Sequence, residues 1–278
     1  MLAHAVPQQG VPPQAQSAAR YARPANPTHS NVSPGMDFLG LRFNADTMDR
    51  VIERIGSRSP RESFAYVVTP NVDHVVRLHN MRTDLWPAYR HAWLTLCDSR
   101  ILRRLAIRAG VRLSTLPGSD LTEALLQKVI KPRDSVAILG GDAESIRRMC
   151  ARYNLENVAH FHPPMGFIEK EDEVERAIAF LREARARYVL LAVGSPQQEI
   201  VAYRVEKTGT ATGIGLCVGA SLDFLTGRQQ RAPIIMQRLS LEWLHRLLSA
   251  PSRMWRRYLV DGPLILSIYR SWRSRLFN

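Results

Sequence analysis

The chain has 278 residues and a mass of 31.5 kDa, enough for one large or two small domains. Its three scattered cysteines, Cys97, Cys150 and Cys217, argue against a disulfide framework or a zinc site and indicate a reducing compartment. The net charge of +13 favours an anionic partner, and the sequence lacks the long apolar run of a membrane helix and the pattern of a secretory signal.

The N-terminal residues 1–36 are rich in Pro, Gln, Ala and Ser and include no acidic residue. This composition cannot bury enough apolar surface to offset its ordering entropy, so we expect a disordered tail, with globular sequence from about Asp37. Deleting residues 1–36 is expected to leave the melting temperature and the activity essentially unchanged. Thermal unfolding and an activity assay of the shortened chain test this; a large fall in either would show that the segment packs or binds.

Strand and helix patterns alternate over residues 37–233. Apolar runs separated by helices of 10–17 residues are typical of βαβ units, so the sequence predicts an α/β core with a Rossmann-like, mostly parallel sheet and flanking helices. Ligands in such sheets bind beyond the carboxyl ends of the strands. The predicted strands are 63–68, 93–97, 135–139, 158–162, 188–193 and 213–218; the clearest helices are 99–109, 119–130 with Ser119 as its N-cap, and 171–187.

Two strand ends carry polar side chains suited to sugar chemistry. Asp98 directly follows a predicted strand, where a carboxylate can act as a general base; alternatively it caps the next helix. Thr69 and Asn71 flank Pro70 at the end of the first strand, and both offer hydrogen bonds to sugar hydroxyls unless this is an ordinary loop.

Two further strand ends suggest nucleotide contacts. Gly140 and Gly141 resemble half of a dinucleotide-binding turn, whose backbone N–H groups and following helix receive phosphate; a plain turn is the alternative. Gln198 opens a helix after another strand, where its amide would bind a uracil or sugar edge. His160 and His162 have no acidic or cysteine partner nearby in the sequence, so we predict no metal site.

The C-terminal segment is strongly basic. From Arg228 to Asn278 there are ten Arg and two acidic residues, which accounts for 8 of the 13 net charges. The sequence therefore predicts that residues 234–278 form an appendage of two or three Arg-rich amphipathic helices, broken near Pro251 and Pro263. Interleaved Trp and Tyr favour a membrane interface, and clustered Arg favours phosphate; a solvated charged face is the alternative. If one helix continued through this segment, three of its arginines would share one face: Arg246, Arg253 and Arg256.

Six motifs in this order resemble the WecG/TagA/CpsF family of bacterial glycosyltransferases, over about 80% of the chain. They are TPNVDHV (69–75), LCDSR (96–100), PGSDLT (117–122), GSPQQE (194–199), VGASLDFLTGRQQRAP (218–233) and LEWLHRLLSAPSRMWRRY (241–258).

The resemblance implies an inverting transfer from a UDP-sugar to an undecaprenyl-diphosphate-linked sugar in surface polysaccharide synthesis. It implies no required metal or cofactor, and a peripheral location on the cytoplasmic face of the plasma membrane. Asp98 matches the family's general base. Thr69 and Asn71 match residues of the active-site pocket, and Gln198 matches a Gln of the family in the helix that follows a strand. Arg246, Arg253 and Arg256 match the arginines expected to reach the acceptor diphosphate.

The chain departs from the family pattern at two positions. Ser99 replaces a glycine after the Asp, and Thr115 replaces an arginine expected to contact the donor phosphate. A neighbouring Arg100 or Arg112 is available for that contact.

Two other classes of protein fit the composition. A basic nucleic-acid-binding protein fits the sequence pI near 10.4, but the Arg is concentrated in an aromatic amphipathic segment and no nucleic-acid motif is present. A non-catalytic regulator that binds nucleotide sugars is the second alternative. The sequence predicts neither the sugar transferred nor an oligomeric state.

Overall fold

The computed structural model describes residues 35–219, 221–227, 232, 233, 236 and 241–276, without the side chains of Asp223 and Arg253. The expected tail, apart from Gly35 and Met36, lies outside the described residues.

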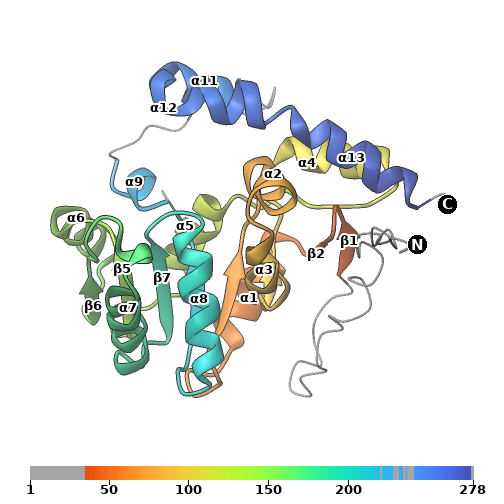
Figure 1. Cartoon of the computed structure of the whole chain (residues 1–278). Coiled ribbons are helices and arrows are strands. Elements are labelled where there is room, and N and C mark those ends of the chain that lie inside the picture. The colour runs from red at the N-terminus through yellow and green to blue at the C-terminus, as the bar shows by residue number, and fades with distance from the viewer. Residues whose placement is uncertain (1–34, 220, 228–231, 234–235, 237–240, 277–278) are drawn as a thin grey trace, which may run out of the picture. The chain divides into compact units, whose positions relative to one another are not determined.

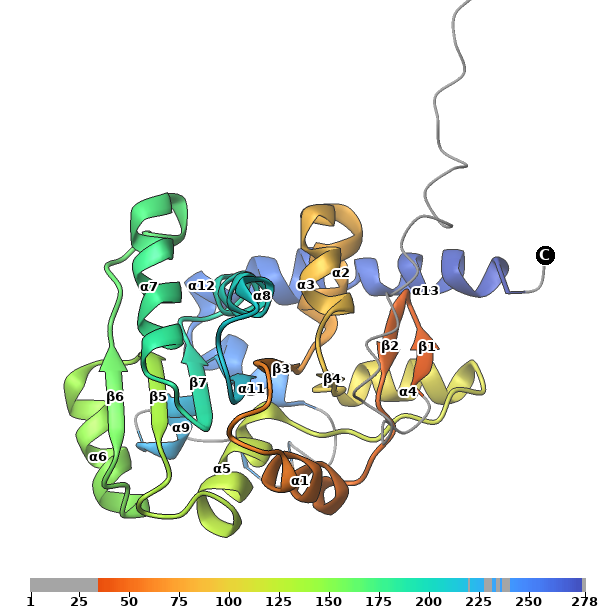
Figure 2. The same ribbon diagram turned by 90° about the horizontal axis from the view of Figure 1, so that it is seen from below.

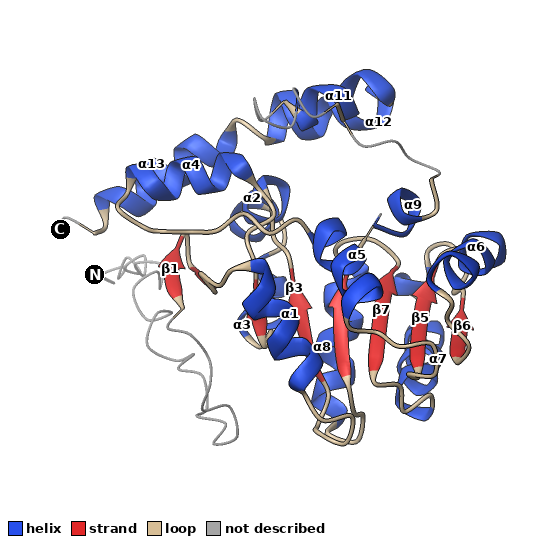
Figure 3. Cartoon of the chain, turned by 180° about the vertical axis from the view of Figure 1, so that it is seen from behind, coloured by secondary structure: helices blue, strands red, loops and turns tan. Residues whose placement is uncertain are grey.

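A six-stranded, all-parallel sheet forms the centre of the fold (Figure 3), which confirms the predicted α/β class. Its strands are short, and all except the partly exposed edge strand at Val158–Phe161 are almost entirely buried, as expected where helices cover both faces. In spatial order the strands are β4 (Leu94–Thr95), β3 (Ala65–Val68), β8 (Ile214–Cys217), β7 (Tyr188–Ala192), β5 (Val136–Gly140) and β6 (Val158–Phe161).

The register aligns the carboxyl ends of these strands at one edge of the sheet. Gly140 pairs with Ala192 at the end of β5 and β7, and Val68 pairs with Thr95 at the end of β3 and β4. The loops that follow these strands therefore share one edge, where ligands bind in parallel sheets.

Helices pack on both faces of the sheet (Figure 2). Each layer has its own buried cluster of mainly aliphatic side chains. One layer contains α1 (Met48–Ser57), α5 (Gly118–Lys128), α6 (Ala143–Tyr153) and α9 (Ser221–Leu225); the other contains α2 (Val72–Asn80), α3 (Trp86–Arg90), α7 (Glu171–Glu183) and α8 (Gln197–Thr208). Two single turns, η1 (Thr83–Leu85) and η2 (Phe167–Glu169), precede α3 and α7, and α4 (Arg100–Arg108) follows β4.

An antiparallel hairpin, missed in the sequence, opens the described chain. It pairs β1 (Met36–Phe38) with β2 (Leu41–Phe43) through Leu39 and Gly40, both at positive φ. Strands of three residues are too short to show a hydrophobic alternation. Phe38 is buried and meets the Trp272 ring edge-on at 5.1 Å.

The C-terminal helices are interrupted where the sequence suggested a break. They are α11 (Glu242–Ser249), α12 (Pro251–Trp255), the π-helical segment η3 (Arg256–Asp261) and α13 (Leu264–Ser274). Ala250, at φ −148° and ψ 66°, leaves the helical conformation, as residues before proline tend to do. Arg246 therefore does not share one continuous helix with Arg256, and the predicted single face is wrong.

The last helix is part of the hydrophobic core. Ile265, Ile268 and Tyr269 of α13 are buried in the same cluster as Phe38 of the hairpin. Removing residues 234–278 would uncover this apolar surface, so single substitutions test the function of the segment more cleanly than truncation.

The predicted N-cap of the helix at 119–130 is wrong. The helix α5 begins at Gly118, with Pro117 at the N-cap and no side-chain cap, while Ser119 bonds to its neighbour Asp120 at 3.3 Å. The start of α5 packs closely against the end of β3. A Cβ at Gly118 would lie only 2.8 Å from Thr69 Oγ1, so glycine permits this close approach.

Candidate active site

Asp98 occupies a fixed position at the carboxyl edge of the sheet. Its backbone N–H donates to the carbonyl oxygen of Pro70 at 3.1 Å, which ties it to the turn after β3. Ser99, and not Asp98, caps α4, because Ser99 Oγ accepts from the Leu102 N–H at 3.2 Å. The alternative role of Asp98 as a helix cap is therefore wrong, and its carboxylate is available for other chemistry.

The carboxyl group of Asp98 is tuned to titrate near neutrality. Although it keeps some exposed surface, the surrounding protein removes much of its hydration, and this desolvation raises its pKa to about 7. The Arg246 charge and a hydrogen bond from the Gly118 backbone N–H act in the opposite direction, while Asp120 and Glu242 add to the rise. A general base works best with a pKa near the operating pH, so Asp98 suits that role.

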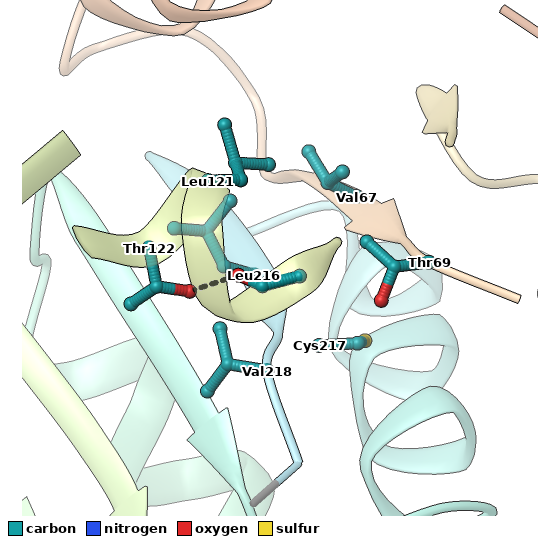
Figure 4. Close-up of a pocket in the computed structure, with 8 residues that line it drawn as sticks. Val67, Thr69, Leu121, Thr122, Leu216, Cys217 and Val218 are labelled. Atoms are coloured by element: carbon teal, nitrogen blue, oxygen red, sulfur yellow. Dashed lines mark hydrogen bonds between the residues drawn. The ribbon is translucent and has the colours of Figure 1, made fainter. Parts of the chain in front are cut away.

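A small cavity lies between the ends of β3 and β8 and the first turn of α5 (Figure 4), and Gly118, which bonds to Asp98, is one of its lining residues. The Thr122 hydroxyl donates to the Gly118 carbonyl oxygen at 2.7 Å and so holds this turn in place. Thr69 brings a hydroxyl to the wall of the cavity. The lining residues are Val67, Thr69, Gly118, Leu121, Thr122, Leu216, Cys217 and Val218.

Asn71 has a structural role at the same turn. Its side-chain oxygen accepts from the backbone N–H groups of Asp73 at 3.0 Å and His74 at 3.4 Å, which caps α2. With that oxygen bound to the helix, the amide NH₂ is the group of Asn71 suited to a substrate contact, and its role in the pocket stays a prediction.

The turn after β5 requires glycine for its backbone conformation and for its close packing on the neighbouring strand, and its contact with phosphate stays a prediction. Gly140 and Gly141 have φ of 96° and 71°, and a Cβ at Gly140 would lie 2.7 Å from the Ala192 carbonyl oxygen. Asp142 then caps α6 by accepting from the Ser145 N–H at 2.9 Å. The helix after β5 lies on one face of the sheet and the helix after β7 on the other, so the ends of these strands are a topological switch point, where ligands bind in such sheets.

His160 contacts the glycine turn through its imidazole ring. Its Nε2 lies 3.1 Å from the carbonyl oxygens of both Gly140 and Gly141. Within the described part of the chain, no three His, Cys, Asp or Glu side chains form a cluster suited to a metal ion.

The family model described as Glycosyl transferase WecG/TagA/CpsF family matches residues 36–278, from the first strand of the hairpin through the C-terminal helices. The chain belongs to this family. It is therefore a glycosyltransferase of cell-surface polysaccharide synthesis, with a nucleotide-sugar donor and an acceptor as substrates.

Gln198 of this glycosyltransferase lies in a buried polar network. Its Oε1 accepts from the Gly219 N–H at 2.7 Å, and its Nε2 donates to Glu199 Oε1 at 2.8 Å. Burial raises the pKa of Glu199, partly opposed by hydrogen bonds with Gln198 and Ser195. In this structure Gln198 holds the loop after β8, and its contact with substrate remains a prediction. The role of Glu199 was missed because a Glu in the first turn of a helix is ordinary.

We predict that this network of hydrogen bonds stabilises the folded protein. Glu199→Ala removes the acceptor of the buried Gln198 amide and is expected to lower the free energy of unfolding by about 1–3 kcal/mol. Glu199→Gln keeps a carbonyl oxygen there and serves as the matched control. Chemical denaturation measures both variants, and equal stability of Glu199→Ala and the unchanged enzyme would contradict the assignment.

The arginines of the C-terminal segment differ in their surroundings. The positive charge of Arg246 opposes the rise in the pKa of Asp98, and its guanidinium lies over the Phe224 ring, 5.4 Å from the ring centre. Arg256, in contrast, is exposed on η3. The side chain of Arg253 lies outside the described residues. Arg100, one of the two candidates for the donor phosphate, follows Asp98 by two residues and lies 3.5 Å from Glu242.

Arg257 was not among the predicted site residues, yet it connects η3 to the turn beside the site. It lies 3.4 Å from Asp73 in the first turn of α2, the helix that Asn71 caps. Burial, with the charges of Arg77 and Arg257, holds the pKa of His74 well below its usual range. The sequence did not distinguish Arg257 from the other arginines of this segment, so its contact with α2 could not be predicted.

The two parts of the site are separated along the sheet edge. Four strand intervals lie between β4, which precedes Asp98, and β5, which precedes Gly140. At about 4.8 Å per interval this is roughly 19 Å. An elongated ligand such as a nucleotide sugar can reach from the glycine turn toward Asp98.

Proposed function

We propose that this chain transfers a sugar from a UDP-sugar to a polyprenyl-diphosphate-linked sugar, with inversion at the transferred carbon. The position of Asp98 carries the proposal: a carboxyl group with a pKa of about 7, at the ligand-binding edge of a parallel sheet and close to Arg246. Among the described residues, no helix is both long and apolar enough to cross a membrane.

The chemistry is a single displacement. The Asp98 carboxylate accepts the proton of the acceptor hydroxyl as that oxygen bonds to C1 of the donor sugar. The bond from C1 to the β-phosphate oxygen breaks, and UDP leaves with the electron pair. Because the acceptor attacks opposite the leaving group, the configuration at C1 inverts.

The leaving UDP needs positive charge or N–H donors. The glycine turn at Gly140 and Gly141 and the N-terminus of α6 suit a phosphate. Arg100, two residues from Asp98, suits the β-phosphate in place of the arginine replaced by Thr115. Thr69 and the amide NH₂ of Asn71 are suited to the hydroxyls of the transferred sugar.

The acceptor is proposed to approach from the C-terminal helices. Arg246, with Arg253 and Arg256, would bind its diphosphate, since Arg forms paired hydrogen bonds with phosphate oxygens. Trp255 and Leu259 are more than half exposed and suit the surface of a bilayer. The three free cysteines fit a reducing compartment, which supports a peripheral site on the cytoplasmic face of the plasma membrane.

A panel of UDP-sugars, each with and without a synthetic lipid-diphosphate sugar, tests the proposal. At least one donor should release UDP faster when the acceptor is present, and a new disaccharide should appear. Donor binding without acceptor-dependent release would favour a non-catalytic regulator. A gel shift with random DNA, with no release from any donor, would favour a nucleic-acid-binding protein.

A further inference from the structure

Helix α4 presents an exposed face that combines arginine and isoleucine. Leu102, Leu105 and Ala106 turn toward the core, whereas Ile107 is 52% exposed on the opposite side. Arg103 and Arg104, one helical turn before Ile107, flank it on the solvent face. An exposed face of this kind, basic with one apolar side chain, suits anionic headgroups, because each cation near such a surface contributes to binding.

The surrounding sequence contains no negative charge to balance these arginines. Residues 99–119 contain five Arg and no acidic residue. One exposed isoleucine would be unremarkable by itself. However, of the twelve large apolar side chains that are exposed among the described residues, nine lie on α4 or between Glu242 and Leu276.

Helix α4 and the C-terminal helices lie on the same side of the sheet. Figures 1 and 3 show both beyond the carboxyl ends of the strands, where Asp98 lies. The ion pair between Arg100 and Glu242, at 3.5 Å, connects the beginning of α4 to the beginning of α11. This ion pair places α4 beside the first of the C-terminal helices.

We propose that α4 is a second membrane-contacting element, which lies on anionic phospholipid headgroups while Ile107 enters the interface. The inference rests on the proposed function, because it assumes an acceptor held in a bilayer. Asp98 lies two residues before α4, so contacts through both α4 and the C-terminal helices orient the catalytic base toward a membrane-bound acceptor. A single contact would leave the enzyme free to tilt.

The test uses charge reversal on α4, away from the catalytic groups. Arg104→Glu with Arg108→Glu is expected to weaken binding to vesicles that contain anionic lipid by about 10-fold or more, because each cation near such a surface contributes to binding. Arg133→Glu with Arg182→Glu makes the same change of charge near the amino ends of the strands and should have little effect. Ile107→Ser should weaken binding even at high salt, where charge effects are screened.

Turnover of a water-soluble, short-chain lipid-diphosphate acceptor, measured without vesicles, distinguishes failure of the α4 membrane contact from failure of the proposed function. The α4 variants should keep this activity within about twofold and lose activity only on vesicles. Equal vesicle binding by the α4 and control variants would overturn the inference and leave the proposed function intact. If the α4 substitutions instead convert an oligomer to a monomer by light scattering, the face binds a second copy and the inference is wrong. No turnover of the soluble acceptor by the unchanged enzyme would refute the proposed function.

Discussion

Replacing Asp98 with asparagine is expected to lower the rate of sugar transfer by at least ~10²-fold, the usual scale for loss of a general base. Asparagine has nearly the same shape but cannot accept the proton of the acceptor hydroxyl. Binding of the donor should be kept, because Asp98 acts on the acceptor. Single-turnover transfer with isothermal titration of UDP measures both quantities.

The pH dependence provides a second measure of the same residue. With a pKa of about 7, Asp98 is protonated and inactive as a base below that pH, so the rate should rise toward pH 7 and level off above it. The raised pKa also means that the ionised carboxylate costs stability in the folded state, increasingly as pH rises from about 4 to 7. Asp98→Asn should therefore be at least as stable as the unchanged enzyme at pH 8. Near-normal turnover by this folded variant would refute the role of Asp98.

Replacing Arg246 with alanine is expected to lower transfer by roughly 10- to 100-fold, the scale of a lost hydrogen bond to a charged group. The same change should move the midpoint of the pH profile upward, because the Arg246 charge opposes the rise in the pKa of Asp98. Arg246→Lys should largely restore the midpoint, since it keeps the charge, but not the rate, since lysine cannot pair with two phosphate oxygens.

Arg275→Ala is the matched control for Arg246, because it removes the same charge from an exposed position near the end of the chain. It should leave the midpoint unchanged and affect transfer only through vesicle binding. If Arg246→Ala and Arg275→Ala lower transfer equally, and both in proportion to vesicle binding, Arg246 acts through general electrostatics and not at the diphosphate.

The sequence predicted those elements whose pattern is long enough to be distinctive. The strands at 188–193 and 213–218 are apolar runs ended by glycine or by a change in composition, and they appear as β7 and β8 with slightly shorter bounds. The β1–β2 hairpin was missed because each strand has only three residues. The helix start at Ser119 was misplaced because the helix begins without a side-chain cap, at a glycine that packs closely on Thr69, which is distant in sequence.

The site was predictable to the extent that strand ends reveal it. Asp98 follows a strand, and parallel topology alone brings it to the ligand edge. The closeness of Arg246 depends on how α11 returns over the sheet, which no local pattern records. The hydrogen bond from the Gly219 N–H to Gln198 likewise joins the loop after β8 to the first turn of α8, 21 residues away, and neither motif predicts it.

The configuration of the product at C1 of the transferred sugar tests the central claim most directly. NMR of the purified lipid-linked product, through the one-bond carbon–proton coupling at C1, determines it against the donor of known configuration. A single displacement assisted by Asp98 predicts inversion. Retention of the donor configuration would contradict the account, because it requires two displacements or a different attacking face.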